Sequence, residues 1–173
     1  MTHRPNRFSH LRLAGQLLML GLVLWCVLLQ PALPARASLL HLEGPPPADL
    51  GVGAKGLSPC QSPSHCAWAS WPVENAQEAL ERLLPSVLAL DGVDLVETDR
   101  GYLHATVTSR VFGFVDDLEL FANSAQGQLQ ARSQSRLGDS DLGVNARRLE
   151  RLHGELLAAT RGMAAPKGGG LKP

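Results

Sequence analysis

The sequence predicts an α+β fold in which two helices pack on one face of an antiparallel sheet of about four strands. Three observations predict this fold class. Residues 76–88 carry apolar side chains at helical spacing, residues 93–136 hold successive segments that alternate between apolar and polar side chains, and residues 145–161 return to helical spacing. A helix, a run of strands joined by short turns and a second helix are typical of an α+β sandwich.

The N-terminal 37 residues match a secretory signal peptide. Three arginines lie within the first 12 residues, residues 13–29 are apolar and uncharged, and Ala35-Arg36-Ala37 offers a small-residue cleavage site before Ser38. We therefore expect an exported protein of the periplasm, the thylakoid lumen or the extracellular space. The alternative is an uncleaved membrane anchor, because about 17 apolar residues are at the short end of what spans a bilayer. In that form we expect the N-terminal segment alone to contact the membrane.

Three further regions follow the predicted signal peptide. Residues 38–58 are rich in proline and glycine and include Pro45-Pro46-Pro47, which favours an extended linker. Residues 59–161 form the single α+β domain. Residues 162–173 contain three consecutive glycines and few apolar side chains, so we expect a disordered tail.

Charge argues against nucleic acid as a partner. The chain has 16 basic and 16 acidic residues, and four of the arginines lie in the predicted signal peptide. The mature domain therefore keeps 12 basic residues against 16 acidic ones, a net charge of −4. Nucleic-acid backbones are bound by clustered lysines and arginines, and the domain has no such basic run.

The cysteines predict one disulfide. Removal of Cys26 with the signal peptide leaves Cys60 and Cys66, and an even count outside the cytoplasm favours a bond between them. A metal site built from these cysteines and His65 would need a fourth ligand and a different spacing. We therefore predict no metal site. The sequence also has no phosphate-binding loop or dinucleotide fingerprint, so we predict no cofactor.

Each predicted element has its own sequence signals. The first helix presents one apolar face, and Pro85, which lacks an N–H donor, predicts a kink or a stop near Leu84. The second helix begins at about Asn145, a residue type that caps helix starts well. The strands are predicted at residues 93–98, 102–111, 115–122 and 128–136, with Asp99-Arg100-Gly101 and residues 123–127 as turns and Gly113 as a bulge or bend.

Polar side chains follow one face of the predicted strands at residues 102–111 and 128–136, opposite apolar or small ones. A solvated outer sheet face explains this pattern. The functional interpretation is a shallow anion-binding surface, since arginine supplies planar, forked donors to a carboxylate or phosphate. The arginines of that surface are Arg110, Arg132 and Arg136. Internal ion pairs with Asp116, Asp117 or Glu119 would occupy the same arginines.

An enzyme is the alternative interpretation. Asp116, Asp117 and Glu119 offer carboxylates for a hydrolase-like or metal-assisted site, with Arg110 and Arg136 beside them. Strand alternation, however, sends Asp117 and Glu119 to one face of the sheet and Asp116 to the other. No G-x-S-x-G motif is present either. We therefore favour a protein without catalytic residues.

Five segments of the chain together match a family pattern: Pro59–Cys66, Tyr102–Ala105, Ser109–Glu119, Arg132–Gly138 and Ser140–Arg148. They resemble the domain of unknown function 1499 family, over about residues 50–157. The resemblance implies bacterial and photosynthetic-organelle proteins, often exported or membrane-associated, with no established activity. The sequence departs from the family pattern at Ser64-His65-Cys66, where Pro-Asn-Cys is more usual, and at Gln134, which replaces a small residue.

These observations give a hypothesis for function. We expect an exported, non-catalytic binding or interaction module that contacts a partner protein or a small anionic ligand. The contact surface combines the arginine-bearing sheet face with the loop from Ser140 to Asn145. The predicted ligand-binding residues are Arg110, Arg132, Arg136, Asp116, Asp117, Glu119, Ser140, Asp141 and Asn145.

Overall fold

The computed structural model describes residues 42–164. The predicted signal peptide, residues 1–37, lies outside the described residues, and so does the predicted tail from residue 165 onward. No helix within residues 42–164 is long and apolar enough to cross a membrane.

Five antiparallel strands form the main sheet, in the order β3-β7-β6-β5-β4. The predicted α+β class is confirmed, and the sheet has one strand more than expected. The additional strand is β3, at the edge beside β7; it contains three small residues and ends in Pro72, so its propensity signal is weak. Proline is tolerated there because an edge strand leaves N–H groups without a ladder partner. The strands are β3 (Cys66–Pro72), β4 (Val93–Asp99), β5 (Tyr102–Thr108), β6 (Val115–Asn123) and β7 (Gln128–Ser135).

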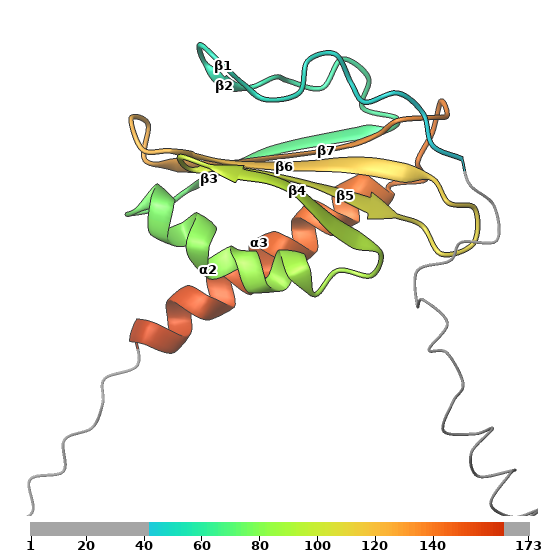
Figure 1. Ribbon diagram of the computed structural model, residues 1–173. Helices are drawn as coiled ribbons and strands as arrows, with labels where there is room; N and C mark the ends of the chain where they lie inside the picture. The colour runs from blue at the N-terminus through green and yellow to red at the C-terminus, as the bar shows by residue number, and fades with distance from the viewer. Residues whose placement is uncertain (1–41, 165–173) are drawn as a thin grey trace, which may run out of the picture. The chain divides into compact units, whose positions relative to one another are not determined.

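Both helices, α2 (Ala76–Leu88) and α3 (Val144–Ala164), lie on the same face of the sheet (Figure 1). Helix α2 begins where the side chain of Asn75 accepts a hydrogen bond from the Glu78 N–H. It does not stop near Leu84, because Pro85 lies in the last turn and removes only one helical bond. Helix α3 continues past residue 161, so residues 162–164 of the predicted tail belong to the helix.

The hydrophobic core lies between the sheet and the two helices. Alternation along the strands sends Leu103, Leu118 and Leu129 into this layer, where each is at most 2% exposed. Leu152 of α3 is buried against them. Burial of each such leucine stabilises the fold by about 1.5–3 kcal/mol. The two helices therefore cover one face of the sheet, and the opposite face is available for other contacts.

Residues 42–58, here called the arm, cross the opposite face of the sheet (Figure 1). The arm contains the short strands β1 (Val52–Gly53) and β2 (Gly56–Leu57), which pair with each other. The Leu57 N–H donates to Gln130 Oε1 at 3.0 Å. Gly56 has φ +103°, a backbone conformation that favours glycine, and an added Cβ would lie 2.0 Å from that same oxygen.

The arm falls within the range that sequence analysis assigned to a linker. That prediction was based on proline and glycine content, which limits the core that a segment can build for itself. It does not limit how the segment packs on a neighbouring surface, and Leu57 of the arm is only 4% exposed. The described molecule therefore has three layers: the arm, the sheet and the helices.

Candidate functional site

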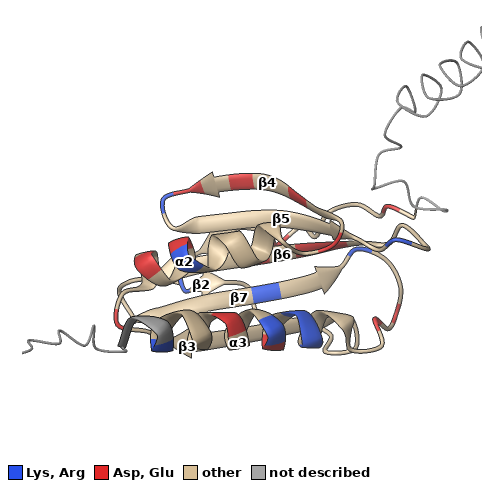
Figure 2. Cartoon of the chain, turned by 90° about the horizontal axis from the view of Figure 1, so that it is seen from below, with Lys and Arg blue, Asp and Glu red and all other residues tan. Residues whose placement is uncertain are grey.

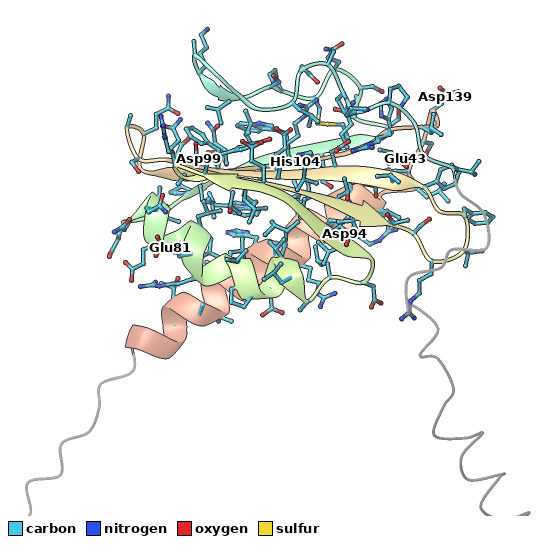
Figure 3. All side chains as sticks on the ribbon, in the orientation of Figure 1. Glu43, Glu81, Asp94, Asp99, His104 and Asp139 are labelled. Carbon is cyan, nitrogen blue, oxygen red and sulfur yellow. A yellow bond between two sulfur atoms is a disulfide. The ribbon has the colours of Figure 1, made fainter. Side chains whose placement is uncertain are left out.

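The face of the sheet beneath the arm, here called the outer face, carries charged side chains from three neighbouring strands. Figure 2, which views the sheet from the helix side, shows an acidic segment on β6 and a basic segment on β7, its neighbour in the sheet. In the strand register Glu119 lies opposite both His104 and Arg132. Directly opposite residues point to the same face of a sheet, so these three side chains share the outer face. His104 and Glu43 both lie on the arm side of the sheet (Figure 3).

The first half of the outer face is built around Arg132 and Glu119. Arg132 Nη1 donates to Glu119 Oε2 at 3.2 Å, and both side chains are 1% exposed. Glu119 Oε1 also accepts from the Tyr102 hydroxyl at 2.8 Å and from the Gly51 N–H at 2.7 Å. Burial and the hydrogen bond to Glu119 raise the pKa of Tyr102 well above its usual value. Tyr102 therefore stays a neutral donor.

The second half is built around Asp117. Arg136 donates to both oxygens of Asp117, from Nε at 2.9 Å and from Nη2 at 2.9 Å, which is the bidentate geometry that arginine favours. His104 Nε2 lies 2.8 Å from Asp117 Oδ1. Burial alone would raise the pKa of Asp117, but the hydrogen bonds from His104 and Arg136 outweigh it and hold that pKa below its usual value. Asp117 is therefore a carboxylate at neutral pH.

The arm adds one carboxylate to each arginine. Arg132 Nη2 donates to Asp49 Oδ1 at 2.8 Å, and Arg136 Nη1 donates to Glu43 Oε1 at 3.0 Å. The side chains of Asp49 and Glu43 are 29% and 48% exposed, in contrast to the almost fully buried carboxylates of the sheet. Each arginine thus has an inner carboxylate from β6 and an outer, solvent-accessible carboxylate from the arm.

A separate polar cluster lies on the helix side of the sheet. Asp116 accepts from the Ser135 hydroxyl at 2.6 Å and from Arg148 Nη2 at 2.7 Å. Asn145 is fully buried, accepts from the Ser133 hydroxyl at 2.6 Å and donates to Ser135 Oγ at 3.0 Å. These bonds attach the start of α3 to β6 and β7. Predicted residues Asp116 and Asn145 therefore lie on the face opposite Arg132 and Arg136.

The loop before α3 is shaped by Asp141. Its carboxylate accepts from the N–H groups of Gly143, at 2.7 Å, and of Asn145, at 2.9 Å. Burial alone would raise the pKa of Asp141, but these backbone hydrogen bonds lower it below its usual value. Asp141 is thus a helix cap, and it does not point to the outer face. Ser140, also predicted as a ligand-binding residue, accepts a bond from the Leu142 N–H at 3.3 Å.

The disulfide between Cys60 and Cys66 is confirmed, with the two Cα atoms 5.7 Å apart. The bridge holds a loop whose carbonyl groups contact the segment before α3. Ser64 O accepts from the Asp141 N–H at 3.0 Å, and His65 O accepts from the side-chain amide of Asn145 at 3.3 Å. The disulfide loop is therefore part of the scaffold that positions α3.

Arg110 does not join the other two arginines. Its side chain is 73% exposed, and its ion pair with Asp91, which is 82% exposed, is 3.8 Å long. The predicted strand over residues 102–111 ends at Thr108, because Ser109 bonds to Phe114 and Gly113 bonds to Ser109 across a tight loop. The predicted surface of three arginines is therefore not assembled, and only Arg132 and Arg136 share a face.

The arrangement of the carboxylates does not match the site that the enzyme alternative requires. The three carboxylates of the enzyme alternative do not converge, since Asp116 lies on the helix side and Asp117 and Glu119 on the outer side. Within residues 42–164, no group of three His, Cys, Asp or Glu side chains is arranged to hold a metal ion. The same face also carries two guanidinium groups, those of Arg132 and Arg136. The Nε of Arg132 is buried without a hydrogen-bond partner among the described residues, so this arginine retains an unused donor.

Sequence reasoning missed several contributors to these clusters, among them Glu43, Asp49 and Arg148. Glu43 and Asp49 were overlooked because they lie in a predicted linker, and no local pattern joins them to arginines more than 80 residues away. Arg148 was also missed as a site residue. Its spacing of three residues from Asn145 on the last helix is a signal that could have identified it, because such residues share one helix face.

Comparison with known proteins gives one match. A family model described as "Protein of unknown function (DUF1499)" matches residues 2–156. No curated protein and no solved structure matches the chain. The matched range includes all five segments on which the resemblance was based, and it extends almost to the N-terminus.

Proposed function

The chain belongs to the DUF1499 family of proteins of unknown function, and from that premise we propose that its domain is a non-catalytic binding module. The proposed site is the outer face of the sheet, where Arg132 and Arg136 capture a small ligand that carries carboxylate or phosphate groups. The arm covers this site when the ligand is absent and moves aside when it binds.

The observation that carries the proposal is the double pairing of each arginine. The inner carboxylates, Glu119 and Asp117, are 1% exposed and hold the guanidinium groups in fixed orientations. The outer carboxylates, Asp49 and Glu43, reach the same guanidinium groups from the arm. An anionic ligand presents the same oxygen atoms in the same geometry. The arm carboxylates therefore occupy the positions that a ligand would take.

Charge balance supports an exchange between the arm and a ligand. Two arginines face four carboxylates on the outer face, and two of these carboxylates belong to the arm. A dianionic ligand that replaces Asp49 and Glu43 leaves the local charge unchanged. Each charge-assisted hydrogen bond contributes about 1.5–3 kcal/mol, and the ligand regains the bonds that the arm loses. The unpartnered Nε of Arg132 is one further donor for the ligand.

The test is ligand-dependent thermal stability of the protein with succinate and with inorganic phosphate, each compared with sodium chloride at equal ionic strength. Binding raises stability in proportion to ln(1 + [L]/Kd), by about 2.7 kcal/mol at a ligand concentration of 100 Kd. We expect Arg136→Gln to abolish the response. Arg110→Gln, which removes an exposed arginine away from the outer face, is the matched control and should leave the response intact.

A second variant distinguishes ligand binding from a purely structural network. Asp49→Asn removes the competing charge of the arm, so it should tighten succinate binding by about tenfold for each 1.4 kcal/mol of lost competition. If the ion pairs are purely structural, Asp49→Asn should instead give a less stable protein whose stability responds no more strongly to succinate. The proposal is wrong if neither the unaltered protein nor Asp49→Asn responds to either anion, or if Arg136→Gln and Arg110→Gln respond alike.

A further inference from the structure

One end of the sheet gathers exposed apolar side chains from three separate segments: residue 42, residues 109–114 and residues 137–144. We call this surface the apolar end. Of the 13 large apolar side chains that are exposed in the described part of the chain, seven lie here. They are Leu42, Val111, Phe112, Phe114, Leu137, Leu142 and Val144. Single exposed apolar residues are ordinary, but a cluster of them marks a contact surface.

The three segments are physically joined. The Leu42 N–H donates to Gly113 O at 3.3 Å, which attaches the start of the arm to the loop between β5 and β6. Gly44 lies so close to Leu137 that an added Cβ would be 2.7 Å from Leu137 Cγ. In Figure 1 the loop after β5 and the loop before α3 emerge at the same end of the sheet as the start of the arm.

Leu142 shows that exposure at this end is built into the fold. Its backbone has φ +54°, in the left-handed region that costs a residue with a side chain on the order of 1 kcal/mol. The hydrogen bonds from Gly143 and Asn145 to the Asp141 carboxylate impose this conformation. The Leu142 side chain is 84% exposed, so the strain is not offset by burial within the domain. Burial of the Leu142 side chain in an apolar environment outside the domain would offset this backbone strain.

We propose that the apolar end docks on the surface of a lipid bilayer, with Phe112, Phe114 and Leu142 inserted at the boundary between headgroups and acyl chains. Aromatic and aliphatic side chains on a protein surface bind there through the buried apolar area. The exposed Arg110 adjoins this surface and can reach lipid phosphates while its apolar stem stays against the inserted side chains. This contact is additional to the N-terminal segment, and it does not depend on the proposed anion site.

The position of residue 42 indicates a bilayer as the occupant. The uncharged apolar run of residues 13–29 is separated from residue 42 by the 12 residues 30–41. A chain of that length spans at most about 45 Å when fully extended. In the uncleaved form, where the apolar run is a membrane anchor, the apolar end is the part of the domain to which this tether is attached. No comparable constraint directs this end toward a protein partner.

The test uses the full chain, with Cys26→Ser, reconstituted in vesicles of phosphatidylcholine and phosphatidylglycerol. Single labelling sites are introduced as Phe112→Cys or Leu142→Cys, and each carries an environment-sensitive fluorophore. The matched control is Leu157→Cys, at a side chain of α3 that is 45% exposed and lies away from the apolar end. All three proteins have the same tether, so any difference between labels reports docking of the domain.

We expect labels at residues 112 and 142 to shift their emission to shorter wavelengths and to be quenched severalfold by a nitroxide on the lipid acyl chain. The label at residue 157 should show neither effect. The pair Phe114→Ser and Leu142→Ser should remove the quenching at residue 112 without changing far-UV circular dichroism. Equal quenching at residues 112 and 157 overturns the proposal. A shifted emission without lipid quenching also overturns it and indicates a protein contact, with a partner or a second copy of this chain.

Discussion

Substitution of Glu119 by glutamine tests whether the arm really covers the outer face. Glu119 is 1% exposed and accepts hydrogen bonds from Arg132, Tyr102 and Gly51. Glutamine can keep the bonds from Tyr102 and Gly51 through its oxygen, but it then presents its NH₂ group to Arg132, donor against donor. Removal of one partner of a buried ion pair costs about 3–5 kcal/mol. Asp49 still pairs with Arg132, so we expect a value near the lower limit of that range.

The same substitution at Glu78 is the matched control. Glu78 pairs with Arg82 on the surface of α2, and its side chain is 47% exposed. Exposed pairs of this kind contribute about 0.3–0.5 kcal/mol. Glu119→Gln should therefore cost several times more than Glu78→Gln, although the chemical change is identical.

The assay is urea unfolding followed by far-UV circular dichroism, with the free energy of unfolding extrapolated to water. A loss of about 3 kcal/mol is a large part of the total of roughly 5–15 kcal/mol that stabilises a typical domain. If Glu119→Gln does not fold, the double variant Arg132→Met with Glu119→Leu provides the measurement, because apolar replacement of a whole buried pair is often neutral. Equal costs for Glu119→Gln and Glu78→Gln would refute the reasoning and mean that water reaches Glu119.

Two further predictions concern pH and glycine. The pKa of Asp117 is lowered in the folded protein, so its contribution to stability is present above the unfolded pKa of about 4 and is lost as the pH falls through the folded pKa. Urea unfolding between pH 2 and pH 7 should show this loss of stability. Asp117→Asn should make the free energy of unfolding depend less on pH over the same range. Gly92 has φ +71°, and an added Cβ would lie 2.1 Å from Thr108 O, so Gly92→Ala should destabilise the protein by at least about 1–3 kcal/mol. Gly154 lies in the interior of α3 with open space around it, so Gly154→Ala should stabilise the protein by about 0.5–1 kcal/mol. Calorimetric melting temperatures of the two variants that shift in the same direction would contradict this prediction.

Much of the fold follows from the sequence because its core is periodic. Leu83 and Val87 repeat at helical spacing and Leu103, Ala105 and Val107 at strand spacing, so each element indicates which of its faces is buried. Strand β3 was missed because its signal is not local. Its Ala67 and Ala69 pack against the core only once β7 lies beside them.

The candidate site was predictable in kind but not in arrangement. Alternation along the strands correctly separates Asp117 from Asp116, because it depends only on the pleat of one strand. The pairing of Arg132 with the arm depends instead on Asp49, which lies 83 residues earlier in the sequence. No pattern within a strand indicates that a proline-rich segment will cover it. The sequence therefore predicts the charged face, and only the structure shows that the face is covered.

The polar residues that carry the family resemblance divide into two groups with different prospects for function. In the helix-side cluster, Asp116, Ser133 and Asn145 satisfy one another's hydrogen bonds, and Asn145 is fully buried. These bonds attach the start of α3 to the sheet, so a ligand that replaced them would weaken this attachment. In the outer cluster, the inner carboxylates Glu119 and Asp117 pair with the two arginines separately from the arm, so the exchange that we propose would leave both inner ion pairs intact. The substitutions most informative about function are therefore those on the outer face, and substitutions in the helix-side cluster report chiefly on stability.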